Sequence, residues 1–424
     1  MSEYPRKDVL QILNRLYLGR VALLDAEYNR WISKNKYTLK DRSWLVSLLR
    51  NIVKHYSFID EVLKEHLPRW ERLPLKVQNL LRMGVGELLF HSAPSFAIVN
   101  AVVETTKEIE GDFTSLVNAV LRKIAEKRDY YSSILEEEGI ELPPFLEEEW
   151  RNWIGEEDLK LLKKSLSLPP FLYIRINTFK TTEDELMERW REKGIKSSKT
   201  ILPGALKVDI DYSTLLALPE YQEGLFYPQD LGSQLVVKSI SSFIKGRVVD
   251  VCCGVGGKTF NLAQYLSRGE IIAWDKKENK INTLSKFISL FSISNVRPMV
   301  VDAFHPPREF FSTADLVMLD APCSGWGTIR RNPEILLKNP DLKKMAHQQF
   351  SLLISASSLV KKGGIMVYCV CSLTNEETEE VVEKWEAQEG KEWERVSLDK
   401  KEEILIWPHQ FNCDGFFVVA WRKK

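Results

Sequence analysis

The chain has 424 residues, of which 44% are hydrophobic and 28% are charged, and its 59 Lys and Arg residues balance 59 Asp and Glu residues. This length exceeds the size at which a single hydrophobic core stops growing, so we expect two or three domains. No apolar run approaches the ~18 residues of a membrane-spanning helix, and the first thirty residues are too charged for a secretory signal peptide, which predicts a cytoplasmic protein with no membrane contact.

Residues 1–128 have the apolar spacing of an all-helical domain, for example at Val9, Ile12, Leu13 and Leu16. They contain 21 Lys and Arg against 15 Asp and Glu, whereas residues 129–160 contain 2 basic and 11 acidic residues. This reversal of charge predicts a boundary near residue 128, followed by an acidic helical connector over 129–165. A modest positive excess is compatible with nucleic-acid binding but is weak evidence for it.

The periodicity changes after the connector. A strand-like run at 171–177, a helix at 183–193 and a strand at 205–210 predict a small α+β domain over 166–235, with a sheet of the RRM or ferredoxin-like kind. Phe171 and Tyr173 could stack on RNA bases in such a sheet, although strand aromatics lie more often in the core.

Residues 236–424 alternate between predicted strands and helices. The strands are expected at 247–251, 270–275, 297–302, 315–320 and 365–371, and the helices at 258–267, 278–291, 341–361 and 375–389. This alternation is typical of a doubly wound, Rossmann-like α/β domain with a parallel sheet. The last apolar run, 415–421, predicts an antiparallel strand.

A glycine-rich loop follows the first strand of this domain. Gly254, Gly256 and Gly257 would let the backbone approach a ligand closely where the strand turns into a helix. The loop is not a Walker motif, because a cysteine stands at 252 where the first glycine would be required. Alone it is a weak signal that nucleotide-binding loops share with ordinary tight turns.

Acidic residues close the second and third strands. Asp275 suits a ribose diol and Asp302 could receive an adenine amino group, although either aspartate alone could simply cap a helix. Together with the glycine loop they predict an adenosyl pocket. A nicotinamide dinucleotide would normally require G-x-G-x-x-G, and 254–259 ends in Thr259, so the pattern favours S-adenosylmethionine.

Six cysteines occur, all after residue 251. They are Cys252, Cys253, Cys323, Cys369, Cys371 and Cys413. None forms a Cys-x-x-Cys pair, so we predict no metal site, and without a secretion signal we expect free thiols rather than disulfides.

Two of these thiols follow strands of the predicted sheet. Cys323 comes after the buried run Leu316–Asp320, and Cys371 ends the next strand. Because carboxyl ends of adjacent parallel strands meet at one crevice, both sulfur atoms should reach the pocket of Asp320 and Lys258. The lysine and nearby helix N-termini would favour thiolates, whereas inert burial is the alternative for any single cysteine. Our first hypothesis from this pattern is that Cys323 is a nucleophile.

A methyl donor beside a thiolate suggests a specific reaction. C5 of a pyrimidine is too weak a nucleophile to attack a methylsulfonium group, but addition of a thiolate at C6 turns C5 into an enamine-like carbon that can. A base must then remove the C5 proton before the thiolate leaves. One group forms the covalent bond and another helps to break it.

Several motifs carry a family resemblance. In the C-terminal half they are Asp320-Ala321-Pro322-Cys323-Ser324-Gly325, Arg331-Asn332-Pro333-Glu334, Gly363-Gly364, Cys371-Ser372 and Asp414-Gly415-Phe416-Phe417. This half resembles the RNA cytosine-C5 methyltransferases. The segments 80–90, LLRMGVGELLF, and 117–122, VNAVLR, resemble the NusB-like RNA-binding domain, although Ala101 stands where that domain usually has a glutamate. The whole architecture is similar to the Fmu/Sun family of bacterial 16S ribosomal RNA methyltransferases.

The resemblance implies a class I methyltransferase domain in which Cys371 attacks C6 and Cys323 assists product release, the reverse of our first hypothesis. It implies that Asp320 holds the cytosine edge or the donor's amino group, with Lys258 beside the pocket. The implied donor-binding residues are Cys252, Cys253, Gly254, Val255, Gly256, Gly257, Lys258, Asp275, Lys280, Asp302, Ala303 and Asp320. Arg330 and Arg331 are candidates for RNA phosphates, or for surface ion pairs.

The glycine loop departs from the family pattern, because Cys253, Gly254 and Val255 replace Ala-Ala-Pro. No catalytic group is lost, so we expect an active, monomeric enzyme with S-adenosylmethionine as cofactor and 16S ribosomal RNA as partner. Two alternatives stay open: a transfer RNA cytosine-C5 methyltransferase, and a non-catalytic RNA-binding or ribosome assembly factor.

Overall fold

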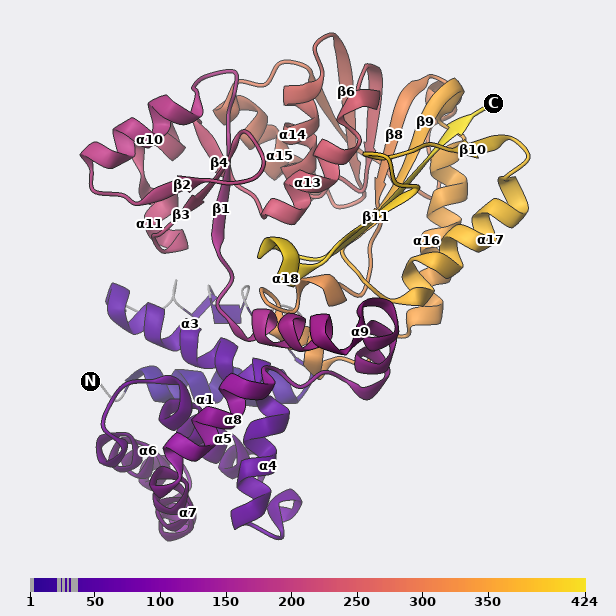
Figure 1. Cartoon of the computed structure of the whole chain (residues 1–424). Coiled ribbons are helices and arrows are strands. Elements are labelled where there is room, and N and C mark those ends of the chain that lie inside the picture. The colour runs from indigo at the N-terminus through magenta and orange to yellow at the C-terminus, as the bar shows by residue number, and fades with distance from the viewer. Residues whose placement is uncertain (1–3, 21–23, 25–26, 29, 32–36) are drawn as a thin grey trace. The chain divides into compact units, whose positions relative to one another are not determined.

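The computed structural model describes residues 4–20, 24, 27–28, 30–31 and 37–424. It divides the chain into two compact units, one formed by Met1–Pro169 and Ile329–Asn339 and the other by Pro170–Thr328 and Pro340–Lys424 (Figure 1). The acidic connector therefore belongs to the first unit, and the small α+β segment belongs to the second. The finer domain boundaries at 128, 165 and 235 stay predictions.

The first unit is helical. Its α-helices are α1 (Tyr4–Tyr17), α3 (Leu39–Lys54), α4 (Tyr56–His66), α5 (Leu75–Phe90), α6 (Ser95–Ile109), α7 (Thr114–Glu126), α8 (Arg128–Glu138) and α9 (Pro144–Ser167), and its 3₁₀ helices are η1 (Trp70–Arg72), η2 (Gly111–Phe113) and η6 (Pro333–Leu337). Pro74 and Pro94 directly precede α5 and α6, since proline lacks the N–H that a helix interior needs. The structure confirms the predicted all-helical front.

Helix α5 lies at the centre of this unit and contains the segment 80–90. A β-carbon at Gly84 would lie 2.6 Å from Leu121 Cδ1 on α7, and one at Gly86 would lie 2.5 Å from Ile52 Cγ1 on α3. The two glycines therefore allow neighbouring helices to pack closely against α5. Burial on all sides explains why this helix lacks the one-sided apolar stripe of a surface helix.

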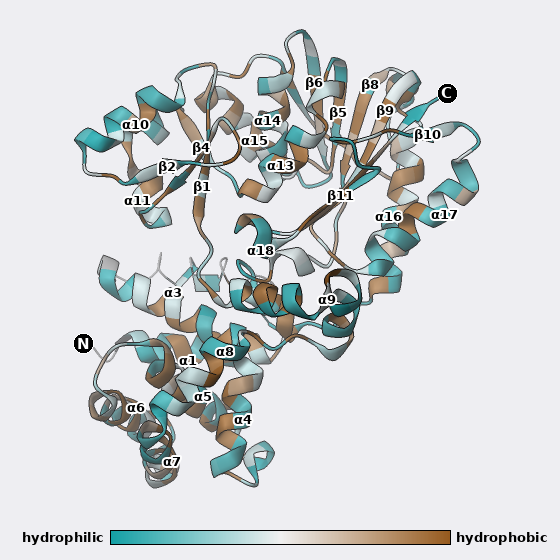
Figure 2. Cartoon of the chain, viewed as in Figure 1, coloured by the Kyte–Doolittle hydropathy of each residue, from teal (hydrophilic) through white to brown (hydrophobic). Residues whose placement is uncertain are grey.

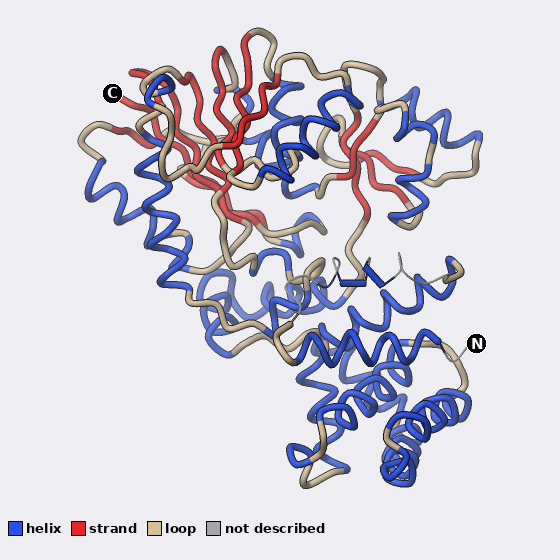
Figure 3. The backbone as a smooth tube through the Cα atoms, turned by 180° about the vertical axis from the view of Figure 1, so that it is seen from behind, coloured by secondary structure: helices blue, strands red, loops and turns tan. Residues whose placement is uncertain are grey.

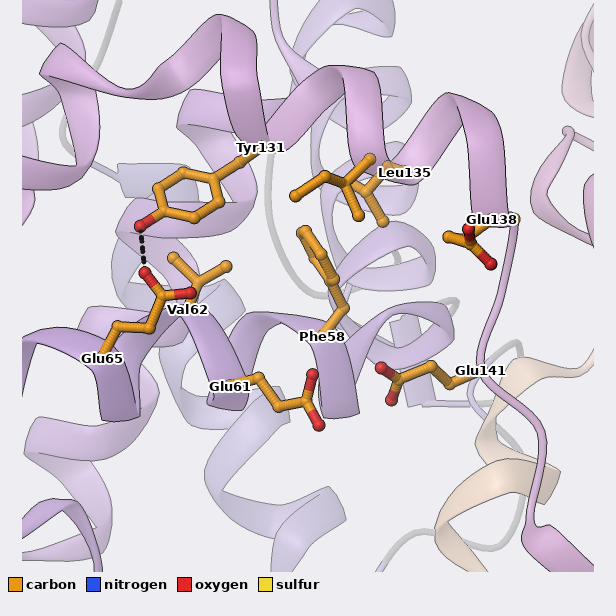
Figure 4. Close-up of a pocket in the computed structure, with 10 residues that line it drawn as sticks. Phe58, Glu61, Val62, Glu65, Tyr131, Leu135, Glu138 and Glu141 are labelled. Atoms are coloured by element: carbon orange, nitrogen blue, oxygen red, sulfur yellow. Dashed lines mark hydrogen bonds between the residues drawn. The ribbon is translucent and has the colours of Figure 1, made fainter.

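A pocket of about 290 Å³ lies between α4 and α8 of the helical unit (Figure 4). Its lining combines apolar side chains such as Phe58 and Leu135 with the carboxylates of Glu61, Glu65 and Glu141. Tyr131 donates a hydrogen bond of 2.7 Å to Glu65, drawn as a dashed line in Figure 4. Burial and the neighbouring Glu61 raise the pKa of Glu141.

The second unit begins with a small antiparallel sheet of order β2-β3-β1-β4. Its elements are β1 (Leu172–Ile176), α10 (Glu183–Glu192), β2 (Ser197–Lys199), β3 (Ala205–Val208), α11 (Tyr212–Ala217), α12 (Pro219–Gln222) and β4 (Phe226–Pro228). The predicted strands and helix are confirmed, whereas β2 and β4 were too short to stand out in the sequence. Tyr173 is 6% exposed and donates to the Asn412 carbonyl, which favours a core role over base stacking.

The larger sheet has the order β10-β12-β9-β8-β5-β6-β7, with β11 paired to β12. Its strands are β5 (Gly246–Val251), β6 (Gly269–Asp275), β7 (Val296–Val300), β8 (Ala314–Asp320), β9 (Val360–Val370), β10 (Trp393–Arg395), β11 (Glu403–Ile406) and β12 (Phe416–Lys423). Figure 3 shows the strands of the two sheets as separate groups. Strands β5 to β9 pair in parallel, and β12 pairs antiparallel to β9. The predicted doubly wound fold is confirmed.

Both faces of this sheet are buried. Alternate strand residues point to opposite faces, so Val248 and Met318 pack in one core while Val249 and Val317 pack in another. The first core is completed by α14 (Gly257–Tyr265) and α15 (Glu278–Phe291), and the second by α16 (Leu342–Ser357) and α17 (Glu379–Glu389). In Figure 2 the central strands are brown, whereas α10 is mostly teal. Continuous apolar strands are the expected consequence of burial on two sides.

Three predicted boundaries were displaced by four or five residues. Strand β9 begins at Val360, and α16 correspondingly ends at Ser357 rather than at 361. The chain after Cys371 forms the 3₁₀ helix η7 (Asn375–Glu377) before α17 starts at Glu379. Among the described residues, no helix is both long enough and apolar enough to cross a membrane.

Candidate active site

The site lies where strand order reverses. The chain runs from β5 outward through β6 and β7, and then returns to the other side of β5 as β8 and β9. In open α/β sheets, ligands bind at the carboxyl ends of strands at such a switch point. Asp320 pairs with Cys369 in the register of β8 and β9, so the loops after these two strands start side by side.

Two thiols meet at the ends of these strands. Cys371 directly follows β9, Cys323 lies in the loop after β8, and their Sγ atoms are 3.2 Å apart. Both side chains are partly exposed, whereas Cys369 is buried in the strand. All six cysteines are free thiols. Adjacent parallel strands thus bring together two sulfur atoms separated by 48 residues.

The two sulfur atoms are not equivalent. The hydrogen bond with Cys371, burial, and the charges of Cys371, Glu377 and Asp320 together raise the pKa of the Cys323 thiol well above its ordinary value. Either sulfur atom can be the donor in this short contact. A raised pKa makes Cys323 a poor candidate for the attacking thiolate, in agreement with the role that the family resemblance implies for it.

Lys258 and Asp320 form an ion pair beside the thiols. The Lys258 ammonium lies 2.7 Å from Asp320 Oδ2, and the Cys369 thiol donates to Asp320 Oδ1 at 3.5 Å. Burial alone would lower the pKa of Lys258, but the charge of Asp320 and the thiols outweighs burial and raises it. The lysine is therefore a permanent cation that fixes the orientation of the carboxylate. The structure brings together all four residues that the sequence singled out as catalytic.

The glycine loop after β5 has an irregular backbone. Cys252 has φ +65°, Gly254 has φ +62° and Gly256 has φ +98°, all in the left-handed region. A β-carbon at Gly256 would lie 2.4 Å from Leu284 Cδ1, so only glycine fits there. At Gly254 an added β-carbon would meet nothing within 4 Å, which leaves open space at the loop surface. Burial raises the pKa of the Cys252 thiol to about 12 and also raises that of Cys253, so neither suits a nucleophile.

Asp275 connects β6 to this loop. Its carboxylate accepts hydrogen bonds from the Gly254 amide at 3.2 Å, the Lys277 amide at 2.9 Å and the Lys280 ammonium at 3.0 Å. Lys280 and Asp275, which were both predicted to bind the methyl donor, therefore contact each other directly. Val255, in the same loop, is 47% exposed.

The third predicted acidic residue is placed differently. Strand β7 ends at Val300, so Asp302 follows the strand by two residues and accepts a hydrogen bond from the Phe304 amide. Ala303 is buried, and its carbonyl accepts a hydrogen bond from Ser355. Asp302 is exposed at the same edge of the sheet as Asp275.

An adenosyl methyl donor fits this set of residues. Gly254 and Gly257 leave the loop backbone open, and α14 directs its N-terminus towards the loop. Asp250, the second-to-last residue of β5, is fully buried, and its Oδ1 has no hydrogen-bond partner while Oδ2 accepts from Thr259 at 2.6 Å. Burial raises the pKa of Asp250 to about 7. The sequence analysis did not identify Asp250 as a site residue, although a carboxylate inside an apolar strand is itself a sign of a functional site.

Sequence reasoning also missed Glu377, the most heavily bonded side chain near the thiols. It is 0% exposed and accepts hydrogen bonds from the Ser324 amide at 2.8 Å, from the Ser324 hydroxyl, and from Gln349 Nε2 at 2.8 Å. In the sequence, Glu377 lies in the acidic run 376–380, which is typical of the first turn of an exposed helix. No local pattern separates it from Glu379 and Glu380, which are exposed.

The two candidate RNA-binding arginines lie in the part of the chain assigned to the helical unit. Arg330 is 2% exposed and donates two hydrogen bonds to the Pro169 carbonyl, at 3.1 and 2.8 Å. This burial favours a structural role over a phosphate contact. Arg331 is half-buried, and its contact with RNA stays a prediction. Among the described residues, no cluster of His, Cys, Asp or Glu is arranged to hold a metal ion.

Comparisons with known proteins match the chain in two parts. The family model described as 16S rRNA methyltransferase RsmB/F matches residues 244–422, and that of the NusB family matches residues 4–126. The chain is 30% identical over 366 residues to ribosomal RNA small subunit methyltransferase B of Thermus thermophilus, covering 86% of this chain and 82% of that protein.

Two further matches cover different extents. The chain is 30% identical over 290 residues to the 28S rRNA (cytosine-C(5))-methyltransferase of Mus musculus, covering 60% of this chain and 35% of that protein. The crystal structure of PH0851 superposes with a TM-score of 0.78 at 26% identity and covers 100% of both chains. The chain has the fold of a methyltransferase, matches two family models and is 30% identical to a relative over 86% of its own length. We conclude that it belongs to the 16S rRNA methyltransferase RsmB/F family and is a methyltransferase with an N-terminal NusB domain.

Proposed function

We propose that this protein transfers a methyl group from S-adenosylmethionine to C5 of a cytosine in 16S ribosomal RNA, through a covalent bond between Cys371 and C6. The observation that carries this proposal is the pair of thiols 3.2 Å apart beside the Lys258–Asp320 ion pair, at the switch point of the sheet. A single nucleophile would need only one of these sulfur atoms. A reaction that both makes and breaks a carbon–sulfur bond has a use for two.

In the first half of the reaction, the Cys371 thiolate adds to C6 and the C5=C6 electron pair becomes available at C5. S-adenosylmethionine supplies an electrophilic methyl group to that carbon. Asp320 can accept a hydrogen bond from the cytosine amino group, because a carboxylate offers only acceptors. Lys258 holds Asp320 in place and adds positive charge near the ring, where negative charge develops as the thiolate adds.

In the second half, a base removes the C5 proton, the C5=C6 bond re-forms and the Cys371 thiolate leaves. Cys323 is suited to this step because the hydrogen bond to Cys371 and the Cys371 charge contribute to its raised pKa. Once the Cys371 sulfur is bonded to carbon, both contributions end and the pKa of Cys323 falls. Cys323 therefore becomes easier to deprotonate in the adduct than in the free enzyme.

The residues proposed to hold the donor are those of the 252–258 loop with Asp275, Lys280, Asp302, Ala303 and Asp320. The open backbone at Gly254 and the buried carboxylate network below the loop support this assignment. At Gly254, one of the substituted positions, an added β-carbon would meet nothing within 4 Å. Isothermal calorimetry with S-adenosylmethionine tests the assignment, and absence of measurable heat would favour a non-catalytic assembly factor.

The RNA substrate is inferred from two observations. The helical front matches the NusB family, and the relatives that span the chain are named for the small ribosomal subunit. We infer a cytoplasmic enzyme, because its substrate would be there in a bacterial cell. A transfer RNA substrate would use the same thiol chemistry and is distinguished only by assay.

The test uses the full-length protein, tritiated S-adenosylmethionine and separate transcripts of 16S ribosomal RNA and transfer RNA. We expect label in 16S RNA, with bisulfite sequencing locating a 5-methylcytosine. Cys371→Ala should abolish transfer, and Cys323→Ala should accumulate a protein–RNA adduct that survives a denaturing gel. Full turnover by Cys371→Ala would overturn the role assignment, and label only in transfer RNA would overturn the substrate.

A further inference from the structure

The loop that carries Cys323 rests on a buried carboxylate. Glu377 has four hydrogen-bond donors: the Ser324 amide, the Ser324 hydroxyl, Gln349 Nε2 and the Thr374 hydroxyl, the last at 3.2 Å. Among the described residues, no lysine, arginine or histidine forms an ion pair with it. Burying an unpaired carboxylate is costly unless it is fully hydrogen-bonded, so these donors are a requirement of its position.

Gln349 on α16 holds the other side of the same loop. Its Nε2 donates both to the Pro322 carbonyl at 3.0 Å and to Glu377 at 2.8 Å. The Gln349 side chain is held in turn by the Tyr368 hydroxyl, which lies within hydrogen-bonding distance of Gln349 Oε1, at 3.2 Å, and of the Glu377 carbonyl oxygen, at 2.7 Å. The carbonyl before Cys323 and the amide after it are thus each bound by one member of a buried pair, Gln349 and Glu377.

The same network reaches the chain that follows Cys371. The Ser324 and Ser372 hydroxyls are 3.0 Å apart, and Ser372 contacts Thr374 at 3.3 Å. Ser372, Thr374 and Glu377 are all 0% exposed. The segment after one thiol and the loop of the other are therefore joined through hydrogen-bonded side chains, of which Ser324 is partly exposed and the other three are buried.

We infer that Glu377 and Gln349 are positioning residues that hold Cys323 against Cys371 for the release step. The inference rests on the proposed function, in which Cys323 acts after methyl transfer. Neither side chain needs to touch the base, because both act on the backbone on either side of Cys323. Loop motion of about 1 Å is enough to cost ~100-fold in rate when a reacting group is displaced.

Glu377 also affects Cys323 through its charge. Its carboxylate is one of the causes that raise the pKa of Cys323 in the free enzyme. Replacing Glu377 by glutamine removes the charge but keeps an oxygen acceptor, whereas replacing Gln349 by methionine removes the amide and leaves the charge. Both substitutions therefore alter an anchor of the loop, and only Glu377→Gln also changes the charge near Cys323.

The experiment compares Glu377→Gln and Gln349→Met with wild type, with Cys323→Ala, and with the control Glu380→Gln. Glu380 lies three residues from Glu377 but is exposed, and it accepts a hydrogen bond from Asn375. Two rates are measured with 16S RNA: methyl transfer in a single turnover with enzyme in excess, and steady-state turnover. Denaturing gels quantify the covalent adduct.

We expect both variants to retain single-turnover transfer within about threefold, to lose steady-state turnover by about tenfold or more, and to accumulate adduct. Glu380→Gln should match wild type. A purely structural role would lower both rates together and leave no adduct, and that result would overturn the inference. So would wild-type behaviour of both variants.

Thiol alkylation gives a second measurement that needs no RNA. Mass spectrometry follows the modification of Cys323 and Cys371 by iodoacetamide at pH 8, and we expect Cys323 to react faster in Glu377→Gln than in wild type, because the variant loses one charge that raises the pKa of Cys323. An unchanged Cys323 rate would count against the inference even if no RNA is ever methylated. If Cys323→Ala traps no adduct and wild type transfers no label, the proposed function fails separately.

A variant that does not fold is recognised by its melting curve. Ser324→Ala then replaces it, because that substitution removes one hydrogen bond to Glu377 and one to Ser372 from a partly exposed side chain. It should show the same imbalance between the two rates, at a smaller size. Equal loss of both rates in Ser324→Ala would overturn the inference.

Discussion

Gly327 offers a direct test of how the loop after β8, which carries Cys323, is positioned. Its amide donates to the Cys371 carbonyl at 3.0 Å, and its own carbonyl accepts from the Gly415 amide at 2.7 Å. A β-carbon at Gly327 would lie 2.3 Å from the Gly415 oxygen and 3.0 Å from the Cys371 oxygen. Both neighbours are backbone atoms, so no side chain can rotate away to make room.

The magnitude follows from these distances. Non-bonded carbon atoms make favourable contacts at about 3.5 Å, so the backbone at 327 or 415 must move by about 1 Å in Gly327→Ala. Overpacking of this kind costs about 1–3 kcal/mol of folding free energy, and a 1 Å displacement beside the thiols costs up to ~100-fold in turnover. Equilibrium urea unfolding measures the first quantity and steady-state methylation measures the second.

Gly111→Ala is the matched control. Gly111 has nothing within 4 Å of the added carbon and does not have a left-handed φ. We expect this variant to keep full activity and to gain a few tenths of a kcal/mol, because alanine restricts the unfolded chain. Wild-type stability and activity in Gly327→Ala would refute the steric reasoning. Lost stability with full activity would show that the Gly327 contact does not position the thiols.

Two further predictions concern buried charges. Burial raises the pKa of Asp250 from 3.8 to about 7, so between pH 4 and pH 7 the folded protein retains a proton that the unfolded chain releases, and the free energy of unfolding should fall as the pH rises through this range. Asp250→Asn removes this titration, so its stability relative to wild type should increase by ~2–3 kcal/mol between pH 5 and pH 8, as measured by urea unfolding. A stability difference that does not change with pH would contradict this prediction. In the helical unit, Arg6 donates two hydrogen bonds of 2.8 Å to Glu87, and both side chains are buried. Arg6→Met would leave the Glu87 carboxylate unpaired and should lower the free energy of unfolding by about 3–5 kcal/mol, as measured by thermal unfolding. An unchanged melting temperature would show that the ion pair adds no net stability.

The parts of the fold that the sequence predicted are those with local signals. Continuous runs of apolar residues located every boundary of β5, β6 and β8 within one residue, because a strand buried on both faces must be apolar throughout. In the helical unit, Pro74 and Pro94 directly precede α5 and α6. The strands β2 and β4, with three residues each, left no periodic pattern to detect.

The candidate site divides in the same way. Lys258, Asp320, Cys323 and Cys371 stand at strand or helix ends, so their approach follows from the parallel order of the strands. Glu377 could not be found in this way, because its burial depends on the packing of α16 against the chain after β9. Arg330 shows the converse case, since a charged residue beside a catalytic loop proved to be 2% exposed.

The sequence by itself determined the fold class, the family and the residue types available for chemistry, since each depends on motifs or periodicities contained in short segments. Only the tertiary structure decided that the two sulfur atoms are in contact, that the hydrogen bond with Cys371 and burial raise the pKa of Cys323, and that Glu377 and Gln349 bind the backbone on either side of it. These features depend on distances between segments far apart in the chain and on exclusion of water from the carboxylates. A linear pattern of residues contains neither quantity.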